Sequence, residues 1–237
     1  MLWYKGWLET RFRVLFMFLF AIFPIALFTL GPFPRNPAPQ GYLNLMPAMV
    51  QMFSLYYTII PLLLAGSGVK TQSEGFRPAK GLHGSIYFTL SLPVSRFRLF
   101  RTRVGLGMLE AAALLAIPPC ALWILFPASR TQISGADLFK YWVTLAVCTA
   151  GPYCLGVLLS TVLDEVWHGW ISMFGVIVLW WLLSTAPLPK AANIFRAMGT
   201  SSPLFTHSLP WSSMGASLGA AAILFLTAKR VVEAGEY

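Results

Sequence analysis

The chain has 237 residues, of which 57% are hydrophobic and only 11% charged, and this balance excludes an ordinary soluble domain. A formal net charge of +9 would suggest nucleic-acid binding in a soluble protein, but here the basic residues lie beside apolar stretches. Membrane topology and anionic headgroups explain positive charges in such places, so we expect membrane lipids as partners and not nucleic acid. The 3 cysteines also lie in apolar stretches, at spacings that predict neither a disulfide framework nor a zinc site.

Six stretches have almost no charge, and each is long enough to cross a hydrocarbon core about 30 Å thick as a helix. We therefore predict an all-α integral membrane protein with one transmembrane domain over residues 1–237. The predicted spans cover residues 14–30, 44–65, 104–126, 138–160, 169–186 and 211–228.

The N-terminal residues 1–13 combine basic side chains with aromatic ones, and two interpretations remain open for them. They suit a short helix lying in the membrane interface, or a set of anchors flanking the first span. Basic residues before an apolar run are also typical of a signal peptide, but this run is long and no A-x-A cleavage site follows it. We keep residues 14–30 as the first span, with a kink predicted at Pro24.

Prolines and short polar runs predict where the other helices break or end. Pro118 and Pro119 lie past the middle of the third span, and Gly151-Pro152 interrupts the fourth. Residues 31–43 are predicted as a proline-rich turn, 127–137 as a polar turn and 161–168 as an acidic turn. Residues 187–210 are too charged for a full span and too apolar for a plain loop. We expect them to dip back toward the membrane as a re-entrant segment between spans 5 and 6.

The distribution of basic residues predicts the orientation. With the N-terminus inside, 12 of the 17 Lys and Arg residues fall in the two termini and in the loop at residues 66–103. Both termini and this loop are therefore expected on the cytoplasmic side of a plasma membrane.

The loop at residues 66–103 is long, amphipathic and rich in charge, unlike the rest of the chain's interior. Residues 73–90 have helical character, with Leu82, Ile86 and Leu90 four apart on one face. Pro93 breaks this helix, and Ser95 is suited to cap the next one. The arginines that follow point all around the helix, so they do not form one binding stripe. A helix lying on the membrane and turning tightly into the third span would act on that span as a lever.

The residues of this loop resemble a known family. Glu74 is followed by the sequence FTLSLPVSR at 88–96 and by GLGMLE at 105–110. This order is similar to that of permease subunits of type-two ABC exporters, which often carry an acidic residue and an L-P-x-S-R turn between spans 2 and 3. The six-span layout, the inside termini and the long segment before the last span match as well. The common G-T-L after the acidic residue is replaced by GFRPAKGLHGSIYFTL, which leaves the helix register open.

In that family the loop carries a coupling helix that docks on a separate nucleotide-binding subunit. The resemblance implies this role for residues 74–92, with the coupling contacts made by Glu74, Arg77, Leu82, His83, Ile86, Leu90, Pro93, Ser95 and Arg96. The chain contains no G-x-x-x-x-G-K-[ST] loop, so we expect a transport subunit and not an enzyme. ATP and Mg²⁺ would bind to two copies of a partner ATPase, and this chain would hold no cofactor. A second permease, identical or different, would complete the pathway in a bacterial inner membrane.

Glu110 is the one ionisable residue well inside a predicted span. A carboxylate there costs about 3 kcal/mol on insertion scales, so it should face protein or water. We favour a bond to a neighbouring helix near the cytoplasmic end, with a place in the lining of the pathway as the alternative.

Three further features have weaker implications. Gly215 and Gly219 form a G-x-x-x-G pattern, which predicts close helix packing either within the subunit or at a dimer interface. Asp164, Glu165 and His168 offer two or three metal ligands, but a solvated turn explains them better, so no metal site is predicted. His207 has no partner evident in the sequence.

Other functions remain possible at this stage. A secondary transporter would show matching broken helices in its two halves, and no repeat is visible. A membrane-embedded enzyme would need clustered catalytic groups, and a purely structural subunit would leave the amphipathic loop without a motor. The scarcity of charge in the spans favours a hydrophobic or amphipathic cargo.

Overall fold

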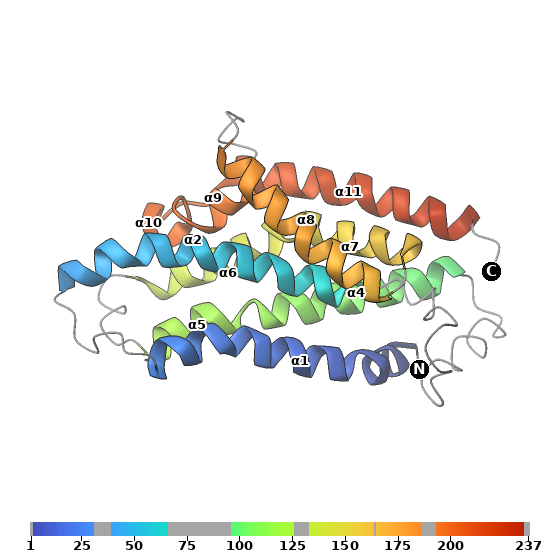
Figure 1. Cartoon of the computed structure of the whole chain (residues 1–237), viewed down its shortest axis with the longest axis horizontal. Helices are drawn as coiled ribbons and strands as arrows, with labels where there is room; N and C mark the ends of the chain where they lie inside the picture. The colour runs from blue at the N-terminus through green and yellow to red at the C-terminus, as the bar shows by residue number, and fades with distance from the viewer. Residues whose placement is uncertain are drawn as a thin grey trace.

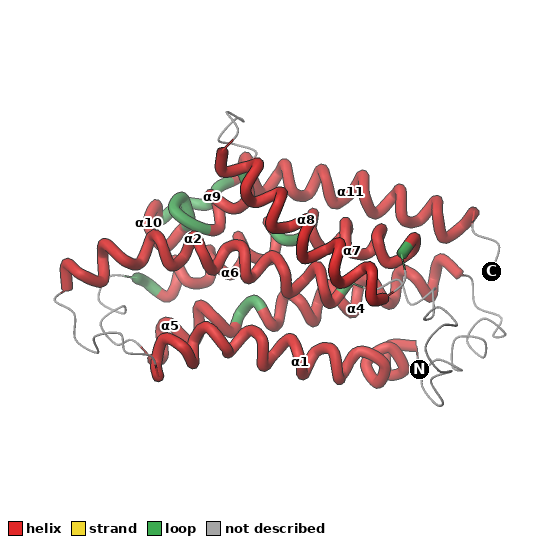
Figure 2. Tube along the Cα trace, in the orientation of Figure 1, coloured by secondary structure: helices red, strands yellow, loops and turns green. Residues whose placement is uncertain are grey.

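The computed structural model describes residues 2–30, 39–65, 96–125, 133–163, 165–185 and 193–234, and nearly all of these residues belong to helices (Figures 1 and 2). No strand occurs among them, as expected for an all-α protein. The helices are α1 (Leu2–Leu30), α2 (Pro39–Leu64), α4 (Arg96–Leu114), α5 (Ile117–Leu125), α6 (Gly135–Cys148), α7 (Ala150–Val162), α8 (Glu165–Thr185), α9 (Ile194–Met198), α10 (Pro203–Thr206) and α11 (Trp211–Ala234).

Within these described ranges, three helical stretches are long and apolar enough to cross a membrane: Phe100–Ala121, Gly135–Val162 and Trp211–Ala234. They correspond to the predicted spans 3, 4 and 6. Predicted spans 1, 2 and 5 coincide with α1, α2 and α8, of which α2 and α8 contain the shorter apolar stretches Phe53–Leu64 and Trp170–Trp180. The fold is thus that of an all-helical membrane protein, and the six-span layout stays a prediction.

Helix α1 contradicts one of the two interpretations of residues 1–13, that of a separate helix in the membrane interface. It runs from Leu2 to Leu30 without interruption, so residues 2–13 continue into the first span and do not form a separate interfacial helix. The sequence offers no proline between Leu2 and Phe23 that would end the helix. Pro24 lies inside α1 and does not end it.

The predicted breaks in spans 3 and 4 are present, two or three residues before the prolines. Span 3 consists of α4 and α5, separated by a turn at Leu115 and Ala116, and span 4 consists of α6 and α7, which meet at Thr149. A proline lacks the N–H that would bond the carbonyl four residues earlier, so the helix is weakened before the proline itself. The predicted acidic turn at 161–168 is wrong in extent, because α7 continues to Val162 and α8 already begins at Glu165.

Helix α7 lies at the centre of the bundle and packs against α11 and α2. Tyr153 and Val157 on α7 are almost fully buried, together with Phe100 on α4 and Val232 on α11. The start of α1 and the end of α11 lie at the same end of the bundle (Figure 1). We refer to it as the terminal end, and to the other, where α6 begins, as the opposite end.

The segment predicted to dip back between spans 5 and 6 contains two short helices, α9 and α10. Phe195 and Met198 of α9 are almost fully buried, and α9 packs against α2 and α6. Residues 193–210 are therefore folded into the opposite end of the bundle, which explains why they are apolar without being long enough to span a membrane.

Candidate functional sites

Glu110 connects helices α1 and α4. It lies in α4 and is only 8% exposed, and the Thr10 hydroxyl on α1 donates a hydrogen bond of 2.7 Å to its Oε1. Its Oε2 is buried and finds no hydrogen-bond partner among the described residues. A carboxyl group in this setting joins two helices through one oxygen and keeps the other oxygen inside the protein and away from lipid, as expected of an acidic residue in a membrane-spanning helix.

Removing the Thr10 hydroxyl should weaken the α1–α4 contact. In Thr10→Val the Glu110 Oε1 loses this donor, and an unsatisfied buried polar atom costs about 1–3 kcal/mol. We expect a lower thermal unfolding midpoint in detergent, and a smaller effect for Glu110→Gln, which keeps an oxygen that can accept from Thr10. Strictly additive effects of Thr10→Val and Glu110→Leu in a double-mutant cycle would contradict the contact.

A side chain from α11 forms hydrogen bonds with the backbone groups at the break in span 4. Pro152 has no N–H to offer the Cys148 carbonyl, and the Ser217 hydroxyl donates to that carbonyl at 2.8 Å. The Gly151 N–H in turn donates to the Ser217 Oγ at 3.2 Å. One hydroxyl therefore satisfies an acceptor and a donor of the broken helix, as is common where proline interrupts a membrane-spanning helix.

Tyr153 connects the same region to α4. Its hydroxyl donates a hydrogen bond of 2.9 Å to the Val104 carbonyl. The approach depends on Gly107, because a Cβ at this position would lie 2.5 Å from the Tyr153 hydroxyl oxygen. Single polar side chains thus join α1 to α4, α4 to α7 and α7 to α11 inside an apolar bundle.

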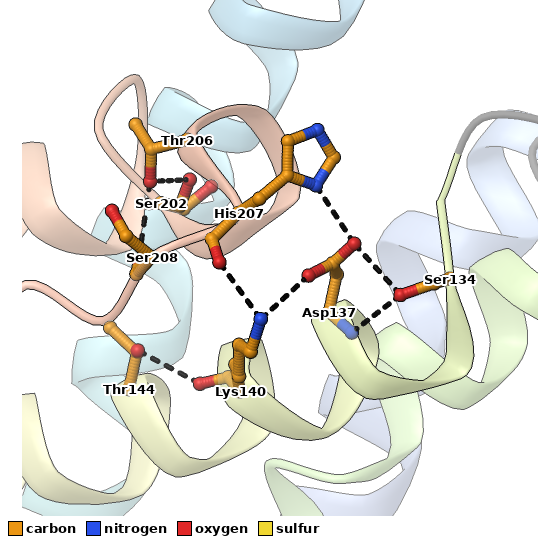
Figure 3. Close-up of polar contacts among 8 residues, drawn as sticks. All are labelled: Ser134, Asp137, Lys140, Thr144, Ser202, Thr206, His207 and Ser208. Atoms are coloured by element: carbon orange, nitrogen blue, oxygen red, sulfur yellow. Dashed lines mark hydrogen bonds and ion pairs between the residues drawn. The ribbon is translucent and has the colours of Figure 1, made fainter.

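A second polar cluster lies at the opposite end, between the start of α6 and the loop after α10 (Figure 3). Asp137 is 5% exposed, and its Oδ1 accepts from the Lys140 ammonium at 3.1 Å. Its Oδ2 lies 2.8 Å from both the Ser134 hydroxyl and the His207 Nδ1. The Lys140 ammonium also donates to the His207 carbonyl at 2.8 Å. We call these four residues the Asp137 cluster.

The Asp137 cluster is built for holding two segments together. Ser134 caps α6, because its Oγ accepts from the Asp137 N–H at 3.1 Å. His207 has a positive φ of 54°, an uncommon backbone conformation that its two contacts with α6 stabilise. The hydroxyl and the imidazole both contact the carboxylate and not each other, so the order of a Ser-His-Asp triad is absent from the cluster.

Breaking the Asp137 cluster should loosen the segment between spans 5 and 6. In Asp137→Ala the buried acceptor of Lys140 and His207 is lost, and hydrogen bonds to charged groups contribute about 1.5–3 kcal/mol each. We expect faster backbone hydrogen exchange in α9 and α10 than in the wild type, with α1 unchanged. Asp137→Asn, which keeps the side-chain shape and one oxygen, should have a smaller effect. Unchanged exchange in α9 and α10 would show that the cluster holds nothing there.

The predicted coupling residues are not placed by the structure. Glu74, Arg77, Leu82, His83, Ile86, Leu90, Pro93 and Ser95 lie outside the described residues. Arg96 is the first residue of α4, directly after the predicted cap Ser95. Asp164 also lies outside the described residues, while Glu165 and His168 belong to α8 and not to a turn.

The G-x-x-x-G pattern does not mediate packing within the described part of the subunit. Gly215 and Gly219 are exposed, and no described atom lies within 4 Å of a Cβ built on either residue. Helix α11 instead packs through a different face, which includes Ser217, Ala221 and Ala228. Of the two alternatives the sequence left open, packing against another chain remains the prediction.

Sequence reasoning missed the Ser217 contact and the Asp137 cluster. A signal existed for part of each: Pro152 implies an unpaired carbonyl at Cys148, and Ser134-x-x-Asp137 has the spacing of an N-terminal cap. The partners Ser217 and His207 follow their contacts by 66 to 70 residues in the chain, and no local pattern connects them.

We compared the chain with protein-family models, with curated proteins and with solved structures. None of the three comparisons found a match.

Proposed function

We propose that the chain is the membrane-spanning permease subunit of an ATP-driven exporter and is moved by separate ATPase subunits. The observation that carries this proposal is the position of α4. It begins at Arg96, the last residue of the L-P-V-S-R sequence, and continues unbroken to Leu114 in the third predicted span. A force applied to the loop at the cytoplasmic side would therefore act directly on a rigid helix.

The contacts of α4 support its role as a lever. Near its start, Phe100 stacks on Phe225 of α11 with ring centroids 5.6 Å apart, and the Lys229 ammonium lies 4.7 Å from the centre of the Phe97 ring. Further along, Val104 accepts the hydrogen bond from Tyr153 of α7. Movement of α4 would consequently be transmitted to α7 and α11, and through Glu110 to α1.

The breaks in spans 3 and 4 give such a movement two places at which to bend. They lie at Leu115-Ala116 and at Thr149, inside the apolar part of the bundle. Alternating access, with two permeases forming the pathway between them, is the mechanism we propose. The same breaks are the feature that favours the second candidate, a secondary transporter, although they fall in adjacent spans and not at matching positions in two halves.

The first test is purification of the tagged chain from its native membrane in mild detergent, followed by mass spectrometry. We expect a stoichiometric partner with a G-x-x-x-x-G-K-[ST] loop. Recovery of the chain without such a protein, even after cross-linking, would remove the exporter from consideration and leave the secondary transporter.

The second test is charge reversal in the loop. Glu74→Lys, or the pair Leu82→Asp and Ile86→Asp, should abolish stimulation of the partner ATPase while the subunit still inserts and folds. Glu233→Lys is the matched control, because Glu233 is exposed and its one ion pair with a described residue is a 3.8 Å pair with Lys229 on its own helix. Normal ATP-driven transport in the loop variants would refute the coupling role.

A further inference from the structure

An apolar cavity of about 150 Å³ lies beside the break in span 4, between α2, α4, α6, α7 and α11. Its walls come from these helices and from the two breaks, and the residues that line it include Pro61, Met108, Ala112, Ala146, Tyr153 and Leu218. Met108 is 39% exposed and Leu218 is 50% exposed. The cavity therefore reaches the surface between α4 and α11.

The two polar side chains in its wall have their hydroxyl groups bonded to the backbone. The Thr149 hydroxyl donates to the Leu145 carbonyl at 2.8 Å, and the Tyr153 hydroxyl donates to the Val104 carbonyl at 2.9 Å. Both hydroxyl protons are used in these bonds, so the two groups can offer a water molecule only acceptor lone pairs, and the other side chains in the wall are apolar. The cavity thus favours an apolar guest.

The opening of the cavity, at Met108 and Leu218, determines which apolar molecules can reach it. Met108 and Leu218 both lie inside stretches that can cross a membrane, Phe100–Ala121 and Trp211–Ala234. Their exposed surfaces face the hydrocarbon region in a membrane, where acyl chains are the solvent. A dry apolar cavity of about 150 Å³ accepts a guest the size of benzene, so it has room for the end of a chain.

We propose that this cavity is a binding site for the acyl chain of a membrane phospholipid, inserted between α4 and α11 and touching the α6–α7 junction. Ala146 and Ala150 lie on the two sides of Thr149, and all three line the cavity. A bound chain fills the space next to the interrupted helix and supports it there. This site does not depend on the proposed transport function.

The test uses the purified chain in phosphatidylcholine nanodiscs that contain a small fraction of the same lipid with a diazirine at the chain end. After irradiation and digestion, we expect labels on Tyr153, which is only 2% exposed, as well as on Met108 and Leu218. Phe16 and Leu19, at 62% and 60% exposure on α1, report ordinary contact with surrounding lipid. Absence of label from Tyr153, with Phe16 labelled, would overturn the proposal.

Two variants fill the cavity from different walls: Ala112→Leu on α4 and Ala146→Phe on α6. An unchanged unfolding temperature shows that a variant still folds. In such a variant the label on Tyr153 should be lost and the label on Phe16 should persist. Persistence of the Tyr153 label in a folded, filled variant would show that the chain does not enter there. Leu218→Cys in a Cys120→Ala background tests for another occupant, since disulfide-linked dimers would place a second copy at the mouth and refute the lipid site.

Discussion

Replacing Gly156 by leucine is expected to destabilise the folded bundle strongly. A Cβ at Gly156 on α7 would lie 2.7 Å from both the Ala65 Cβ and the Leu62 carbonyl oxygen at the end of α2. The second of these is a backbone atom and cannot move without displacing α2. Overpacking in a well-packed core costs about 1–3 kcal/mol, and we expect at least the upper end of that range here, because a leucine adds three more carbons beyond the Cβ.

Gly219→Leu is the matched control for this change. Gly219 also lies in a long apolar helix, but no described atom lies within 4 Å of a Cβ placed there. We expect unfolding of the monomer in detergent to be unchanged for Gly219→Leu, whereas Gly156→Leu should aggregate or unfold at a much lower temperature. Equal destabilisation by both changes would contradict the packing described here.

Ser217→Ala is expected to destabilise the break in span 4. The change leaves the Cys148 carbonyl without the donor that replaces the missing N–H of Pro152, and it removes the acceptor of the Gly151 N–H. Hydrogen bonds between membrane helices contribute about 0.6 kcal/mol on average and up to about 1.7, so two lost bonds should cost about 1–3 kcal/mol. The measurement is the free energy of unfolding by denaturant in mixed micelles.

Thr227→Val controls for the loss of a hydroxyl from α11. Within the described part of the chain, the Thr227 hydroxyl bonds only the Ile223 carbonyl of its own helix, at 2.9 Å, and the side chain is exposed. It should therefore change the unfolding free energy very little. Hydrogen exchange adds a local readout, since the amides around Thr149 should exchange faster in Ser217→Ala and not in Thr227→Val. Unaltered exchange at Thr149 would mean that Ser217 does not support the break.

The sequence was a good guide to the helices and to where they break, because both depend on local properties. Apolar stretches of sufficient length predict membrane helices, and Pro118 and Pro152 predict interruptions through the backbone N–H that they lack. Ends were less well predicted: α4 begins at Arg96, eight residues before the predicted span, because a helix can continue into polar surroundings where the apolar signal stops. The same reason explains why residues 2–13 belong to α1.

Only the tertiary structure could show which helical faces meet. Periodicity does not distinguish a face buried against protein from one exposed to lipid, since both are apolar in a membrane protein. This is why the pattern of Gly215 and Gly219 drew attention to one face of α11, while the subunit uses the face that carries Ser217. The sequence by itself determined that the chain folds as apolar helices and that prolines interrupt two of the predicted spans. The fold decided that Thr10 would meet Glu110, and that Asp137 would meet His207, because contacts between distant segments depend on how whole helices pack.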